Sequence, residues 1–193
     1  MRDTEHVFLQ RQLHAMPTLP WLWVAPGADW MPPRPADGRG IRLCVDAIGG
    51  RFGGDVQCAL PLPLPAESVN AIVLQHAAGA DVGALLEECS RVLMPGGRLW
   101  MTLFNSCSPY RLHWHGYVDG WPSAARCRRL LQGNGLQCAP LGYLGPAWGS
   151  AGRPGWPVPA IFRAVCVLQA HKRTAARVGP TARPVRVAQP VVS

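Results

Sequence analysis

Polar side chains that could do chemistry follow the predicted strands at the point where each strand ends. His76 comes directly after the apolar run at 69–75, and Asp46 lies near the end of the run at 41–47. An imidazole titrates near neutral pH, so His76 could serve as a general base. The sequence leaves a plainer role open for each residue, because such a histidine can simply hydrogen-bond a loop and such an aspartate can simply be solvated.

The segment 58–105 predicts the elements that would position these residues. Residues 69–74 (VNAIVL) form a short apolar run with β-branched residues, which is typical of a strand buried on both faces. Asp81 can cap a helix over 81–93, whose apolar residues recur at helical spacing. Residues 95–97 (PGG) end that helix and turn the chain into a second buried strand at 98–104. This order predicts two neighbouring parallel strands joined by a right-handed helical crossover.

The remaining elements alternate in the same way. Further strands are expected at 19–25, 41–47, 56–60, 136–144 and 160–170. Helices are expected at 3–16 and at 123–132, the second capped by Ser123. Proline and glycine predict loops at 31–40, 49–55 and 61–66. The pattern predicts an α/β fold with a mostly parallel sheet of about seven strands and reduced helices in the N-terminal half.

Three stretches of the chain also resemble a known family. Residues 91–102 (RVLMPGGRLWMT) resemble the RVLKPGG-x-L signature of class I S-adenosylmethionine-dependent methyltransferases, and residues 62–76 (LPLPAESVNAIVLQH) resemble the run that precedes it. Residues 104–112 (FNSCSPYRL) resemble the continuation found in a small proteobacterial group of type 11-like methyltransferases. The chain is similar to a small, divergent member of that group, with the Rossmann-like methyltransferase fold.

The resemblance implies S-adenosylmethionine as the cofactor and assigns residues to it. Gly27 is the one glycine left in a degenerate glycine-rich loop after the first strand, although an ordinary turn would also explain it. Asp46 would accept hydrogen bonds from the ribose hydroxyls. Cys58, followed by Ala59, stands where the family has the acidic residue on the adenine side, and Gln75 would border the cofactor at the end of its strand.

The resemblance also implies a substrate side. His76 is the candidate base, and Asn105 and Ser106 would face the substrate at the end of the strand 98–104. Asp55 lies three residues before Cys58 and could replace the missing acid only if the loop shifts. The aromatic loops near the same edge could line a pocket or could simply cap the core; their tryptophans are Trp114, Trp121, Trp148 and Trp156.

Composition limits the other function classes. The seven cysteines are scattered without a CxxC pair, which favours reduced, small apolar side chains in a cytoplasmic protein and predicts no metal site. No run of eighteen apolar residues predicts a membrane span. Of the net charge of +8, five basic residues and no acidic residue lie in 171–193. We therefore expect a methyltransferase-like domain over 1–170 and a basic, disordered tail over 171–193 that could contact polyanions weakly.

Two functions from different classes remain open at this stage. The chain could be a methyltransferase that acts on an unknown acceptor. It could also be a catalytically inactive protein of the methyltransferase fold that serves as a binding or scaffold partner, because the glycine loop is depleted and the adenine-side acid is missing. A nucleic-acid binder acting through the tail is the third and weakest interpretation, since no aromatic residue accompanies the tail's charges.

Overall fold

Among the residues that the computed structural model of the chain describes, nine strands form one mixed sheet. The structure describes residues 2–17, 19–33, 39–46, 50–76, 81–108, 122–147 and 159–173. The strands are β1 (Trp21–Ala25), β2 (Gly40–Val45), β3 (Arg51–Gly54), β4 (Cys58–Ala59), β5 (Val69–Gln75), β6 (Leu93–Phe104), β7 (Leu136–Cys138), β8 (Gly142–Ala147) and β9 (Arg163–Lys172). Their order is β4-β3-β2-β1-β5-β6-β9-β7, with β8 also paired to β9. The aromatic loops and residues 174–193 lie outside the described residues.

The four central strands, β2, β1, β5 and β6, run parallel, while the strands added at both sides pair in antiparallel fashion. The sheet thus has a parallel centre, as expected, with more strands than the seven predicted. Because parallel strands end at one edge, the polar residues that follow them are brought to that edge.

The predicted crossover is confirmed. Strands β5 and β6 are parallel neighbours, with Val73 opposite Trp100, and α2 (Val82–Val92) connects them. The Asp81 carboxylate accepts hydrogen bonds from the backbone N–H groups of Gly83 and Ala84, so it caps α2 as the sequence predicts.

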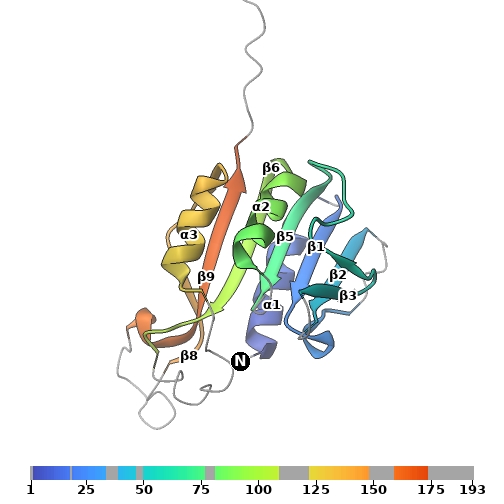
Figure 1. Cartoon of the computed structure of the whole chain (residues 1–193). Helices are drawn as coiled ribbons and strands as arrows, with labels where there is room; N and C mark the ends of the chain where they lie inside the picture. The colour runs from blue at the N-terminus through green and yellow to red at the C-terminus, as the bar shows by residue number, and fades with distance from the viewer. Residues whose placement is uncertain are drawn as a thin grey trace, which may run out of the picture.

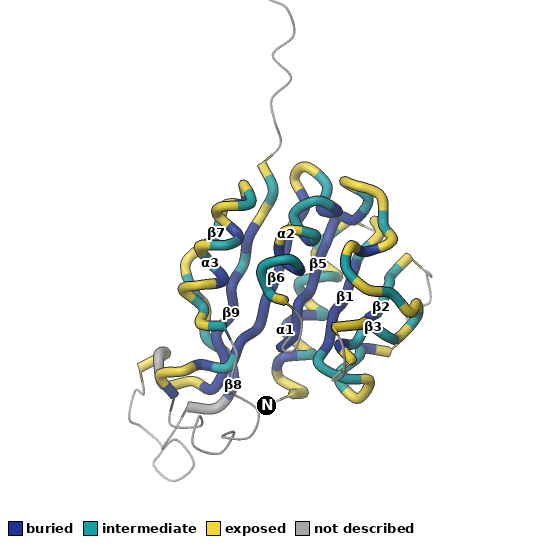
Figure 2. The backbone as a smooth tube through the Cα atoms, viewed as in Figure 1, coloured by how far each residue is buried: buried dark blue, intermediate teal, exposed yellow. Residues whose placement is uncertain are grey.

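Helices cover both faces of the sheet (Figure 1). Helices α2 and α3 (Ala124–Gly133) pack on one face, where the larger apolar cluster lies, and Ser123 caps α3 as predicted. Helix α1 (Arg2–His14) lies on the other face, over a smaller cluster that contains Trp23 and Trp100. Figure 2 shows that the central strands are the most deeply buried part of the chain. No helix in the described part of the chain is long and apolar enough to cross a membrane.

Several predicted boundaries differ from the structure, and three of the differences affect the pocket or the sheet. Residues 49–55 were expected to be a loop, but 51–54 form β3 and pair with β2. Glycine makes this pairing close, since a Cβ at Gly54 would lie 2.4 Å from the Arg42 carbonyl oxygen and its φ is +124°. The stretch predicted as one strand at 136–144 is divided into β7 and β8, because Pro140 has no N–H for a ladder bond. Strand β6 begins at Leu93 and includes the expected turn, with a register shift near its start.

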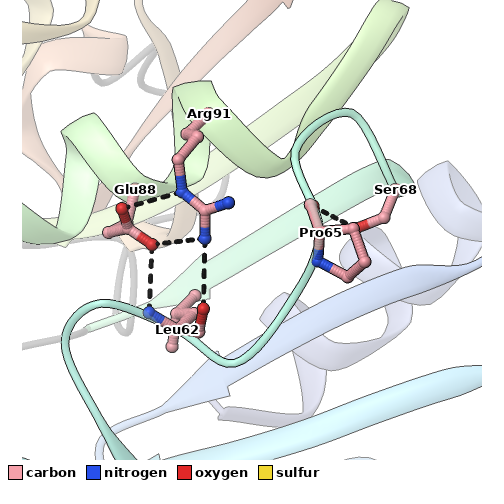
Figure 3. A network of polar contacts seen from close by, with 5 residues as sticks. All are labelled: Leu62, Pro65, Ser68, Glu88 and Arg91. Carbon is pink, nitrogen blue, oxygen red and sulfur yellow. Dashed lines mark hydrogen bonds and ion pairs between the residues drawn. The ribbon is translucent and has the colours of Figure 1, made fainter.

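Side-chain hydrogen bonds attach two other segments to α2: the loop before β5 and the end of β9. Glu88 accepts a hydrogen bond from the Leu62 N–H at 3.0 Å, while Arg91 donates to the Leu62 carbonyl at 3.1 Å, so the pair fixes the loop before β5 (Figure 3). The Nζ atom of Lys172 donates to the carbonyls of Ser90 and Leu93 at 3.0 and 2.9 Å. A cation at this helix end satisfies carbonyls that lack partners within the helix.

Candidate functional site

A pocket of about 630 Å³ opens at the carboxyl ends of β1 and β2. Its floor and walls come from the segment after β1, the end of β2 and the β3–β4 hairpin. The lining residues are Gly27, Ala28, Cys44, Val45, Asp46, Arg51, Phe52, Gly53, Gln57, Cys58 and Ala59. A volume of this size suits a small organic ligand or cofactor.

A bidentate ion pair between Arg42 and Asp55 holds the β3–β4 hairpin against β2. Arg42 donates to both carboxylate oxygens of Asp55, from Nε at 3.1 Å and from Nη2 at 2.9 Å, and its backbone N–H donates to the same carboxylate. This contact fastens the residue after β3 to β2. Asp55 is therefore part of the wall's support and is not among the residues that line the pocket.

Four of the five predicted cofactor residues line this pocket: Gly27, Asp46, Cys58 and Ala59. They come from three separate segments of the chain. Gly27 is extended, with φ −171° and ψ 170°, and a Cβ added to it would meet no atom within 4 Å. Its backbone is therefore open to an approaching ligand, although its conformation does not itself require glycine.

The pocket carries both signs of charge. The exposed Asp46 supplies a carboxylate and Arg51 supplies a guanidinium, and the backbone N–H of Asp46 donates to the Arg51 carbonyl at 2.8 Å. Burial raises the pKa of the Cys58 thiol, so this side chain stays protonated and offers no negative charge where the family has an acid. Sequence reasoning missed Arg51, because it lies in the stretch predicted to be a loop.

The fifth predicted cofactor residue, Gln75, lies away from the pocket, beneath α1, and is fully buried. The Oε1 atom of Gln75 lies 3.2 Å from Nε2 of His6, which also lies 2.8 Å from the Trp30 carbonyl oxygen. Since both neighbours are acceptors, that nitrogen carries the hydrogen. Gln75 thus connects β5 to α1.

His76, the candidate base, is also fully buried beneath α1. Its Nε2 lies 2.8 Å from the Glu5 Oε2, and both side chains have almost no exposed surface. Its ring stacks on Phe104 at a centroid distance of 4.2 Å and meets Trp30 edge-on at 5.3 Å. The backbone at His76 has φ +41°, which turns its side chain out of the β5 alternation and toward α1.

The two predicted substrate-side residues differ from each other. Asn105 bridges two segments, since its Nδ2 donates to the Arg163 carbonyl at 2.7 Å and its Oδ1 accepts from the Cys107 N–H at 3.0 Å. The amide therefore fixes the end of β6 against β9. Ser106 is exposed at the same edge. A role toward substrate stays a prediction for both.

Glu5 was missed because a carboxylate in a surface helix is ordinarily solvated. Glu5 and Leu9 are four residues apart, so they share a helix face, and both are completely buried. No local pattern in the sequence indicates this burial, because the partner His76 lies seventy-one positions away.

The cysteines differ in their exposure, from the buried Cys89, Cys127 and Cys166 to the exposed Cys107. All seven cysteines are free thiols. Burial raises the pKa of Cys89 to about 12, so this thiol is protonated and unreactive. Within the described ranges, no group of three or more histidine, cysteine or acidic side chains could hold a metal ion.

Solved structures show that the fold is shared with methyltransferases. An S-adenosylmethionine-dependent methyltransferase from Archaeoglobus fulgidus aligns with a TM-score of 0.61 over 89% of this chain and 95% of that chain, at 12% identity. Another, from Thermotoga maritima, aligns with a TM-score of 0.54 over 89% and 91% of the two chains, at 14% identity. The [4+2]-cyclase SpnF aligns with a TM-score of 0.54 over 87% and 79%, at 16% identity.

No protein-family model matches the chain, and no curated protein matches it. The structural likeness therefore establishes the α/β fold, and the activity has to be argued from the pocket.

Proposed function

We propose that the chain is an S-adenosylmethionine-dependent methyltransferase and that the pocket at the ends of β1 and β2 holds the cofactor. The observation that carries this proposal is the convergence of Gly27, Asp46, Cys58 and Ala59 on that one pocket. The resemblance to methyltransferase motifs predicted these four residues from the sequence, and they come from three separate segments of the chain. The fold supports the same choice, since it is shared with methyltransferases of very different sequence.

The residues present fit an adenosine that carries an amino acid. Asp46 would accept hydrogen bonds from the ribose diol, and the open backbone at Gly27 would let the ligand approach closely. The opposite charges of Asp46 and Arg51 suit a ligand that is itself charged at more than one place. With no acid at Cys58, backbone groups near Ala59 would have to contact the adenine.

When bound, the cofactor would supply an electrophilic methyl group. The chain's own contribution would then be mostly positioning, because methyl transfer depends on alignment of the acceptor with the methyl group. His76 remains the proposed base, with Glu5 orienting its ring through the 2.8 Å contact. Since His76 is covered by α1, this role requires that α1 or the segment around Trp30 moves when the acceptor binds.

The proposed function does not by itself name the methyl acceptor. We also propose a cytoplasmic location, because the scattered cysteines favour a reducing compartment. A catalytically inactive binding or scaffold protein is the second candidate. The specific observations that favour it are the neutral thiol at Cys58 and the complete burial of His76. The likeness to the cyclase SpnF also shows that this fold occurs in a protein named for other chemistry.

Titration with S-adenosylmethionine and with its demethylated product separates the two candidates. Ligand at about 100 times its dissociation constant should stabilise the fold by about 2.7 kcal/mol, which thermal melting would detect. Calorimetry on the same samples gives the affinity directly. A melting curve that does not shift at millimolar concentrations of either ligand would favour the inactive protein.

A further inference from the structure

Beneath α1, the sheet presents a row of polar side chains where an apolar core is expected. The register places Trp23 opposite Val73 and Val73 opposite Trp100, so the two indoles lie on one face, two strands apart. Gln75 and Thr102 are paired directly in the next row of the same face. All four are completely buried.

Several of these side chains lack a hydrogen-bond partner in the part of the chain that the structure describes. The atoms are Glu5 Oε1, Trp23 Nε1, Gln75 Nε2, Trp100 Nε1 and Thr102 Oγ1. A folded protein has only a few such atoms per hundred residues, and each weakens the fold. Here five of them gather under a single helix, from three neighbouring strands and from α1 itself. A ligand with matching groups would satisfy them.

Helix α1 is attached in a way that allows it to leave. Leu9 is its only completely buried apolar residue within the described chain, and the other completely buried residue is Glu5. Polar contacts supply much of the attachment: Arg2 donates to the Asp29 carbonyl at 3.2 Å, and His6 contacts the Trp30 carbonyl. Phe8 and Leu13 also pack on the cluster but are only partly buried. A helix that buries one apolar side chain completely belongs to the less stable part of a fold, so it can open locally, and this opening would separate Glu5 from His76.

The segment after β1 separates this cluster from the pocket. Gly27 and Ala28 line the pocket, while Trp30, two residues later, meets the ring of His76 in the buried cluster. One short segment of the chain thus contributes residues to both places. A group bound under α1 would have to reach a ligand in the pocket past this segment.

We propose that the cluster beneath α1 binds the methyl acceptor, that the acceptor is a small amine, and that α1 is the cover which opens to admit it. The inference rests on the function proposed above. Glu5 Oε1 is an acceptor in a dry environment, which an amine N–H would satisfy. The rings of Trp30 and Phe104 already contact His76, and an aromatic surrounding of this kind favours a cation. The unpartnered N–H groups of Gln75 and the two indoles would bind acceptor atoms elsewhere on the same molecule.

Calorimetry with paired probes tests the amine. The probes are 2-phenylethylamine and tryptamine, each compared with its alcohol, 2-phenylethanol and tryptophol, in the absence of S-adenosylmethionine. We expect at least one amine to bind tenfold or more tightly than its alcohol. Glu5→Gln should remove this preference, and the matched variant Glu87→Gln, on the exposed face of α2, should keep it. Equal binding of amine and alcohol, or a preference that survives Glu5→Gln, would overturn the proposal.

A second variant is needed because Glu5→Gln alters a buried contact and could destabilise the fold. Thr102→Val keeps the shape of the side chain and removes the unpartnered hydroxyl, so the melting temperature should rise while amine affinity falls. A purely structural hydroxyl would not separate these two measurements. A lower melting temperature would mean that the hydroxyl is already satisfied, and it would count against a site kept for a ligand.

The two proposals fail separately. Amine binding without any binding of S-adenosylmethionine would support the site under α1 and overturn the methyltransferase function. Binding of S-adenosylmethionine with no amine preference would support the methyltransferase function and overturn the amine site under α1.

Discussion

At the scale of single residues, the pocket depends on one carboxylate more than on any other side chain. Asp46 is exposed at the end of β2 and lines the pocket, while Cys58 has no charge to offer. Hydrogen bonds to a charged group contribute roughly 1.5–3 kcal/mol, about twice the value for neutral partners. Under the proposed function, more of the cofactor's binding energy would therefore rest on Asp46 than in a protein with an acid on the adenine side.

Asp46→Asn should weaken S-adenosylmethionine binding by about ten-fold or more, which corresponds to ~1.4 kcal/mol per decade. The substitution keeps the size and one acceptor but removes the charge. Calorimetric titration gives the affinity. Asp29→Asn is the matched control, because Asp29 is an exposed carboxylate next to the pocket-lining Ala28 and does not line the pocket itself. Equal losses in both variants would mean that the effect is long-range charge, and an unchanged affinity in Asp46→Asn would place the cofactor elsewhere.

Gly27→Leu should fill the pocket without disturbing the fold. Its backbone is extended and a Cβ has open space, so the free energy of unfolding should change by less than about 0.5 kcal/mol. Affinity for S-adenosylmethionine should fall at least ten-fold, because the new side chain points toward the space the ligand needs. Gly133→Leu, at the end of α3 and equally open, should change neither quantity. A large loss of stability in Gly27→Leu would contradict the open geometry.

His76 follows β5 as predicted, but its side chain is buried under α1 and is not exposed at the strand end. Its pair with Glu5 is completely buried, and removing one partner of such a pair typically costs 3–5 kcal/mol. A loss of turnover in His76→Ala would therefore combine lost chemistry with lost stability. Thr102→Val, which leaves the pair intact, gives a cleaner measure of what happens beneath α1.

At the scale of elements, the antiparallel β3–β4 hairpin forms the outer wall of the pocket. The hairpin is held by Arg42 and Asp55 and by the close approach at Gly54. On the other side of β5, the Glu88–Arg91 pair fixes the loop that leads into that strand. Polar contacts between side chains and backbone thus hold both of these connections in place.

Glu88→Gln should lower stability at neutral pH and have little effect in acid. The hydrogen bond from Arg91 lowers the pKa of Glu88 from its ordinary value near 4.5. The folded state therefore binds fewer protons, so the contribution is fully present above pH 4.5 and is lost as the pH falls through the lowered pKa. Urea unfolding should show a loss of about 1 kcal/mol at pH 7 that shrinks as the pH falls through the lowered pKa of Glu88. Glu87→Gln is the control, and an equal loss at both pH values would contradict the ion pair.

At the scale of the whole molecule, the sequence predicted the features that repeat and missed those that depend on distant partners. The apolar stripe of α2 and the caps at Asp81 and Ser123 are local, so they were visible. The pairing of β3 was not, because it depends on a contact between Arg42 and Asp55 across thirteen positions. The buried Glu5–His76 pair joins residues seventy-one positions apart, and no local pattern announces it. Of the candidate site, the strand-end residues were predicted, and Arg51 and Glu5 were not.

The last strand extends past residue 170, where the predicted domain ends. Strand β9 continues to Lys172, whose ammonium group contacts two carbonyls at the end of α2 and the Glu67 carboxylate at 3.1 Å. These contacts join the last strand to α2 and to the loop before β5. A chain that stops before Lys172 would lose all of them.

Truncation after Arg173 should leave the melting temperature unchanged, because residues 174–193 contain three prolines and few large apolar side chains that could contribute to a core. Truncation after Ala170 is the matched control and should lower the melting temperature, since it removes Lys172 and leaves the Ser90 and Leu93 carbonyls without this donor. Thermal melting by circular dichroism measures both. If the longer chain, ending at Arg173, also melts at a lower temperature, the tail contributes to the fold. If both truncated chains melt like the full chain, the Lys172 contacts add nothing to its stability.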